Sequence, residues 1–166
     1  MRVARIVCVL FSSAAFALQP TTAPFTLGLW EFTSTSTMKA TGKMADAMSH
    51  SGQAMGTPTT QTMKLCMAGE TWQKALSGMG ARADACTRSN VVATGQKYSL
   101  TLSCNHGSST ISVDSATFFD SPVQMHGTIH LVSNSANGQM VTDGTSTAKF
   151  LSSDCGDVKP LGSAIH

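Results

Sequence analysis

The stretch CTRSNVVATGQKYSLTLSC, residues 86–104, predicts a β-hairpin that is closed by a disulfide. Two runs, 86–93 and 97–104, flank the turn residues Thr94-Gly95-Gln96. If Gly95 is the centre of the turn, paired positions sum to 190, and Cys86 lies directly opposite Cys104. Opposite residues on antiparallel strands have Cβ atoms about 4.5–5.5 Å apart, which is close to what a disulfide requires.

Side chains that alternate between the two faces of a strand also occur before and after this hairpin. Strands are predicted at 26–38 and 59–67 upstream and at 109–119, 124–133 and 139–151 downstream. Gly, Asn or Pro, the residues of tight turns, separate the downstream strands. The pattern predicts a mainly β fold: one antiparallel meander of about seven strands, paired in sequence order. Either a curved sheet or a small up-and-down barrel fits this pattern.

Each strand has one face that we expect to point inward. Trp30 and Phe32 are the expected core anchors of the first strand. The other inward-facing positions are Met63, Leu65 and Met67, then Tyr98, Leu100 and Leu102, then Ile111, Val113 and Phe119, then Met125, Ile129 and Leu131, and finally Met140, Ala148 and Phe150.

One short helix is predicted at 68–80. Trp72, Ala75, Leu76 and Met79 recur at the spacing of one helical face, and Gly80 can end the helix. Trp72 is therefore expected to be a third core anchor. The segment 41–58 is rich in Gly, Ser and Met, and we expect it to be a mobile loop that contains at most one helical turn, at 43–48.

The N-terminus has the pattern of a cleaved signal peptide. Arg2 and Arg5 precede an uncharged apolar run, 6–16, and Ala15-Phe16-Ala17 supplies small residues two apart. We expect cleavage after Ala17, with Ala23 as the alternative. The chain then divides into a signal peptide at 1–17, a linker at 18–25, one β domain at 26–159 and a tail at 160–166. The expected location is the periplasm or the exterior.

Charge and hydropathy argue against nucleic acid as a partner and against a membrane span in the mature chain. The chain has 11 basic and 9 acidic residues, and removal of Arg2 and Arg5 leaves 9 of each. A net side-chain charge of zero argues against nucleic-acid binding, which needs a cationic face. After the signal peptide there is no apolar run long enough to cross a membrane.

Four cysteines remain after cleavage: Cys66, Cys86, Cys104 and Cys155. An even number in an oxidising compartment predicts two disulfides. Because Cys86 is expected opposite Cys104, the second bond should join Cys66 to Cys155. No closely spaced cysteine pair occurs, which argues against a zinc site.

These features together resemble a family of exported bacterial proteins called domain of unknown function three-six-one-seven. The matching residues are Gly28-Leu29-Trp30-Glu31, a following Met-rich stretch, Cys66 at the start of a helix, Cys86 and Cys104 around a hairpin, and Asp154-Cys155 near the end. The family's last strand often ends in a basic residue and Gly before the final Cys, whereas Ser152-Ser153-Asp154 stand here. The resemblance implies a small periplasmic or secreted β domain and no established activity.

The Met-rich segment is the sharpest candidate for chemistry. Met44, Met48 and Met55 with His50 form a possible Cu(I) ligand set, because thioethers are soft ligands. The alternative is that flexible Met side chains fill gaps or line an apolar surface. Met63 and Met67 are expected in the core instead.

Catalytic signals are weak. His126 and His130 would lie about 13 Å apart on one strand face, too far to share a metal. Motifs for nucleophilic catalysis, zinc proteases or phosphate binding are missing. We therefore expect a non-enzymatic envelope protein without a cofactor, one that binds a lipid-like ligand or a hydrophobic partner. A Cu(I)-binding protein is the alternative.

Overall fold

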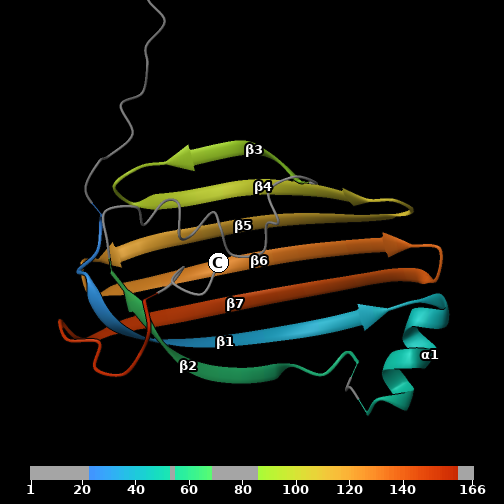
Figure 1. Cartoon of the computed structure of the whole chain (residues 1–166), viewed down its shortest axis with the longest axis horizontal. Coiled ribbons are helices and arrows are strands. Elements are labelled where there is room, and N and C mark those ends of the chain that lie inside the picture. The colour runs from blue at the N-terminus through green and yellow to red at the C-terminus, as the bar shows by residue number, and fades with distance from the viewer. Residues whose placement is uncertain (1–22, 53–54, 69–85, 161–166) are drawn as a thin grey trace, which may run out of the picture.

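A computed structural model describes residues 23–52, 55–68 and 86–160, and the statements below concern these residues. They form seven antiparallel strands and one helix (Figure 1). The elements are β1 (Gly28–Ala40), α1 (Gly42–His50), β2 (Thr59–Met67), β3 (Cys86–Ala93), β4 (Lys97–His106), β5 (Ser109–Ser121), β6 (Gln124–Ser135) and β7 (Gly138–Ser152). All seven predicted strands are present, each within two residues of its predicted ends.

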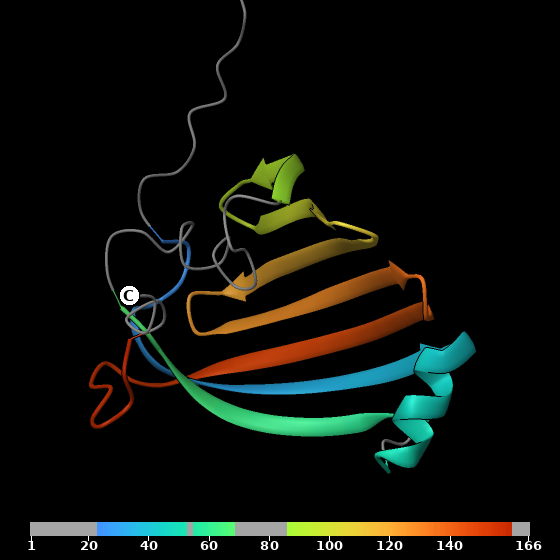
Figure 2. The same cartoon turned by 45° about the vertical axis from the view of Figure 1, so that its right-hand side comes forward.

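The strands form a single sheet in the order β2-β1-β7-β6-β5-β4-β3. β3 to β7 are a meander of adjacent antiparallel strands, as predicted. Sequential pairing was wrong at one place, because β2 does not pair with β3. Instead, β1 pairs with the free edge of β7 from Leu29 to Ala40, and β2 pairs with β1. The sheet is curved and open, and β2 and β3 form its two edges (Figure 2).

The hydrophobic core lies on one face of this sheet, which we call the apolar face. Trp30 is completely buried, and its indole N–H donates a hydrogen bond to the Thr26 carbonyl at 2.9 Å. Phe25 packs between Trp30 and Phe119, with ring centroids 5.8 and 5.7 Å away. Tyr98, Leu100, Leu102, Met125 and Ala148 complete the buried cluster with Met67 and Cys104. Phe32, Ile111, Val113 and Phe150 are partly buried against it.

Two residues predicted to point into the core are exposed. Met63 is 46% exposed and Ile129 is 40% exposed. Met63 lies on the edge strand β2, which has β1 as its one neighbour in the described sheet. Ile129 lies opposite Ser115 and Gly144, which are too small to cover it. The alternation of side chains therefore predicted correctly which face of the sheet Met63 and Ile129 lie on, but it did not predict that they are exposed there. Trp72 and the helix predicted at 68–80 lie outside the described residues.

The prediction of a mobile loop at 41–58 was wrong for α1. Gly42–His50 forms a helix rather than a single turn, and Lys, Met and Ala in GKMADAMSH are good helix formers. The helix packs on the ends of β1 and β7, where the Met44 amide donates to the Asn137 carbonyl at 3.0 Å. In the described residues, no helix is both long and apolar enough to span a membrane.

Two disulfides fasten the sheet, with the pairing that the sequence predicted. Cys86 is bonded to Cys104, its direct register partner on β4. Cys66, at the end of β2, is bonded to Cys155, which follows β7. Cys66 also forms a parallel bridge with Pro160, so the C-terminal segment is held beside the edge strand β2.

Candidate functional site

The face of the sheet opposite the core, which we call the polar face, carries hydroxyl, imidazole and carboxylate side chains. Threonines pair directly across β1 and β2: the hydroxyls of Thr33 and Thr62 are 3.1 Å apart, and those of Thr35 and Thr60 are 2.9 Å apart. Such cross-strand hydroxyl pairs stabilise a sheet face that water can reach. The sequence supplies them because Thr and Ser occupy the outward positions of the strands.

A groove with a volume of about 620 Å³ crosses the middle of the polar face. Its floor follows one row of the sheet, in which Leu100, Ser115, Ile129 and Gly144 are successive register partners on β4, β5, β6 and β7. The side chains of Leu100, Ser115 and Ile129 belong to the apolar face and Gly144 has no side chain, so the floor is backbone.

The groove runs across the strands of the sheet. Its walls are Thr35, Thr37, Pro58, Asn90, Ser99, Thr101, Asp114, Ala116, Thr128, His130, Asp143 and Thr145. From β1 to β3 it spans five strand spacings, about 24 Å at 4.8 Å for each spacing. The volume falls in the usual range for small-molecule sites, about 300–1,000 Å³.

Two groups of polar contacts lie along one register row of this groove. His130 on β6 lies directly between Asp143 on β7 and Asp114 on β5. Its Nδ1 is 2.6 Å from Asp143 Oδ1, so the imidazole donates to that carboxylate. On the other side, the Thr101 hydroxyl donates to Asp114 Oδ1 at 2.6 Å, and Asn90 donates to Thr101 at 3.3 Å. Asp114 and Asp143 are both exposed, so the groove presents two carboxylates to solvent.

Asn90 reaches this row because the edge strand β3 is irregular. The register of β3 shifts between Ser89 and Val92, and Asn90 adopts a positive φ of 52°. Asn is one of the few residues other than Gly that tolerate this conformation. The alternation of side chains in 86–93 does not indicate this irregularity.

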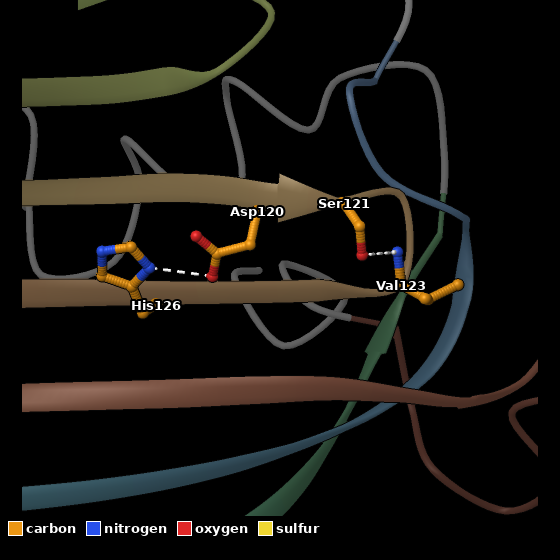
Figure 3. A network of polar contacts seen from close by, with 4 residues as sticks. All are labelled: Asp120, Ser121, Val123 and His126. Carbon is orange, nitrogen blue, oxygen red and sulfur yellow. Dashed lines mark hydrogen bonds and ion pairs between the residues drawn. The ribbon is translucent and has the colours of Figure 1, made fainter.

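A second His–Asp pair lies at the turn between β5 and β6 (Figure 3). His126 Nδ1 is 2.8 Å from Asp120 Oδ2, and the imidazole stacks on Phe118 with ring centroids 4.9 Å apart. The Lys97 ammonium lies 5.4 Å from the centroid of the same Phe118 ring. In the same turn, the Ser121 hydroxyl accepts the Val123 amide at 3.3 Å. His126 and His130 thus each have a carboxylate partner of their own.

The two histidines share the polar face but stand four residues apart on β6. This spacing is about 13 Å in a strand, as the sequence predicted. Within the ranges that the structure describes, no three His, Cys, Asp or Glu side chains are grouped to hold a metal ion.

Glu31 and Lys149 form an ion pair on the polar face, away from the groove. They are register partners on β1 and β7, and Lys149 Nζ is 2.8 Å from Glu31 Oε1. The hydrogen bond from Lys149 and its positive charge hold the pKa of Glu31 below its ordinary value of 4.5, and Lys64 adds a smaller effect in the same direction.

The predicted copper ligands separate into two groups. Met44 and Met48 lie one helical turn apart on α1, and Met48 is buried. His50 is exposed, and its Nδ1 donates to the Asp46 carbonyl at 2.6 Å. Met55 is half-buried beside β1, where the adjacent Gly56 amide donates to the Met38 carbonyl. Met140, which sequence reasoning placed only in the core, lies on β7 near Met38.

Comparison with known proteins gives a family and little more. A family model described as "Protein of unknown function (DUF3617)" matches residues 19–155. No curated protein matches the chain. Among solved structures, the S-type phycobiliprotein lyase CPES from Guillardia theta aligns with 76% of this chain and 89% of its own, at 8% identity and a TM-score of 0.32. A likeness this distant carries no argument about the chain.

Proposed function

We propose that this chain, which belongs to the DUF3617 family of proteins of unknown function, is an exported, non-enzymatic binding protein whose ligand lies in the groove of the polar face. The groove carries the proposal, because it combines a backbone floor with hydrogen-bonding groups along both walls. Most small-molecule sites are concave and place a few polar groups to orient the ligand.

The lining favours a polar ligand over the lipid-like one expected from the sequence. Asp114, Asp143, His130 and Asn90 all face the groove together with several hydroxyls. A hydrocarbon chain would take these groups from water without giving them partners, at about 1–3 kcal/mol for each buried group. Since the described residues of the lining include two carboxylates and no Lys or Arg, we infer a ligand with hydroxyl, amide or cationic groups.

Export is supported by the covalent structure. Disulfides persist in oxidising compartments and are rare in the cytosol, and both described cysteine pairs are bonded. The N-terminal pattern with its cleavage site after Ala17 supports the same conclusion. N-terminal sequencing of the protein recovered from cells should begin at Leu18, or at Pro24 if the alternative site is used.

The absence of catalysis is also part of the proposal. Among the contacts of the described residues, each His–Asp pair lacks a hydroxyl or thiol that the imidazole could activate as a nucleophile. Asp120 and Asp143 instead orient their imidazoles on the polar face.

Blocking the groove tests the binding proposal. Thr145 lines the groove, whereas Thr147 is on the same strand and the same face but outside the lining, and both are exposed. Native mass spectrometry of protein purified from its own compartment should show extra mass on the wild type and on Thr147→Trp. Thr145→Trp should lose this mass while keeping the wild-type circular dichroism and melting temperature. A wild type without extra mass, or a Thr145→Trp variant that keeps it, would contradict the proposal.

A further inference from the structure

The face of α1 that carries Met44 and Met48 is turned toward the rest of the protein. Met48 is 9% exposed and Met44 is half-buried, whereas Lys43, Asp46 and His50 are exposed. Residues four apart lie one above the other on a helix, so the two thioethers share one side. That side belongs to a helix which packs on the ends of β1 and β7 (Figure 1).

Two more methionines lie at this end of the sheet, on a single face. Met38 on β1 is paired with Thr142, and Met140 on β7 is paired with Ala40. Met38 and Met140 are therefore diagonal neighbours on adjacent strands, with a spacing of about 7–8 Å. Two thioether side chains of three rotatable bonds each can close such a distance. Both residues are half-buried.

A fifth methionine reaches the same place from the segment that precedes β2. The Gly56 amide donates to the Met38 carbonyl at 2.8 Å, which fixes the backbone of Met55 alongside the end of β1. Met55 is half-buried. Sulfur side chains from α1, β1, β7 and this segment thus gather at one end of the molecule.

This methionine end is separate from the hydrophobic core. The core cluster contains Met67 and Met125 but none of the five methionines Met38, Met44, Met48, Met55 and Met140. The described cysteines are all in disulfides, so the thioethers are the remaining soft ligands among the described residues. Soft thioether sulfur selects Cu(I) over harder ions.

We propose that Met38, Met44, Met48 and Met140 bind one Cu(I) ion through their thioether sulfurs, with Met55 at the rim of the site. His50 is not a ligand, because it lies two residues from Met48 on another side of α1 and its Nδ1 donates to the Asp46 carbonyl. This site is independent of the groove on the polar face. Its strand ligand Met140 is far from α1 in the sequence, so only the pairing of β1 with β7 brings the set together.

Competition for Cu(I) against a chromophoric chelator tests the site. The titration uses the disulfide-bonded mature protein without oxygen, with ascorbate as the reductant. We expect one Cu(I) to bind to the wild type, and binding to weaken at least about tenfold in Met44→Leu/Met48→Leu and in Met38→Leu/Met140→Leu. Met→Leu changes volume little and costs under about 1.5 kcal/mol, so the variants should stay folded, which circular dichroism checks. Met63→Leu, at an exposed β2 position, and His50→Ala are the matched controls and should bind as the wild type does.

The alternative is that these methionines only fill space between α1 and the sheet. In that case the wild type would not compete with the chelator, or Met38→Leu/Met140→Leu would bind Cu(I) as tightly as the wild type. Either result overturns the proposal. X-ray absorption of the Cu(I)-loaded protein gives a second test: a shell of sulfur atoms is expected, and an imidazole nitrogen in that shell would contradict the proposed ligands.

Discussion

At the scale of single residues, the pair Glu31 and Lys149 shows how a strand register creates an electrostatic contact. The two residues are far apart in the sequence and meet only because β1 pairs with β7. Lys149 lowers the pKa of Glu31 from its ordinary value of 4.5, so the carboxylate is held ionised more strongly in the folded chain than in the unfolded chain. The pair therefore stabilises the fold above the unfolded pKa and stops doing so as the pH falls through the folded pKa.

We predict a pH-dependent effect of Lys149→Met. At neutral pH the variant should be less stable than the wild type, and the difference should vanish once the pH falls below the lowered pKa of Glu31. Urea denaturation of both proteins at neutral pH and in acid measures this difference in the free energy of unfolding. Lys43→Met, on an exposed position of α1, is the control and should show no such convergence. A difference that persisted unchanged at low pH would mean that Lys149 acts through packing rather than through the charge of Glu31.

At the scale of elements, the docking of α1 depends on a close backbone contact with the turn before β7. Gly138 has a φ of 129°, and a Cβ at this position would overlap the Thr41 carbonyl oxygen. Only a residue without a side chain fits between the turn and the start of the helix. The same contact positions Met44, whose amide donates to the Asn137 carbonyl.

Substitution of Gly138 by Ala should therefore loosen α1. Gly52, just after the helix, has a positive φ of 72°, and a Cβ there would meet no described atom within 4 Å, so Gly52→Ala measures the cost of a left-handed φ without a close contact. That cost is about 1–2 kcal/mol for a left-handed residue. Gly138→Ala should destabilise the protein by more than this and speed hydrogen exchange of the Met44 amide. Equal effects of the two substitutions would refute the role of the close contact.

At the scale of the whole molecule, two disulfides restrain the chain over very different distances. Cys86 and Cys104 are 18 residues apart and close a hairpin at the β3 edge. Cys66 and Cys155 are 89 residues apart and tie the β2 edge to the segment that follows the last strand. Because a longer closed loop removes more entropy from the unfolded chain, the second bond should stabilise the fold more.

The expected losses are about 3 kcal/mol for Cys86→Ser/Cys104→Ser and about 4–5 kcal/mol for Cys66→Ser/Cys155→Ser, from loop-closure entropy. Denaturant unfolding of both variants and the wild type measures which disulfide contributes more to the free energy of unfolding. A hairpin variant that proved the less stable of the two would show that local strand pairing, rather than long-range loop closure, dominates the stability.

Much of this architecture was predictable from short stretches of sequence. Strand positions and the opposition of Cys86 and Cys104 follow from alternation and turn residues within one hairpin or one strand. Burial was less predictable, because Ile129 is exposed through the small size of Ser115 and Gly144 on other strands. The extent of α1 was underestimated, at one turn over 43–48 at most, because the glycines and serines around it predicted a loop.

By itself, therefore, the sequence determined the seven strands, their faces and the disulfide pairing, since each depends on local periodicity or on the register of one hairpin. Only the tertiary structure decided that β1 takes the free edge of β7, which leaves β2 and β3 as the two edge strands of the described sheet. That pairing also places Met140 near Met38 and aligns the walls of the groove. The reason is physical: a strand's pattern specifies which face is buried, but its neighbour depends on which edges remain free once the rest of the sheet has formed.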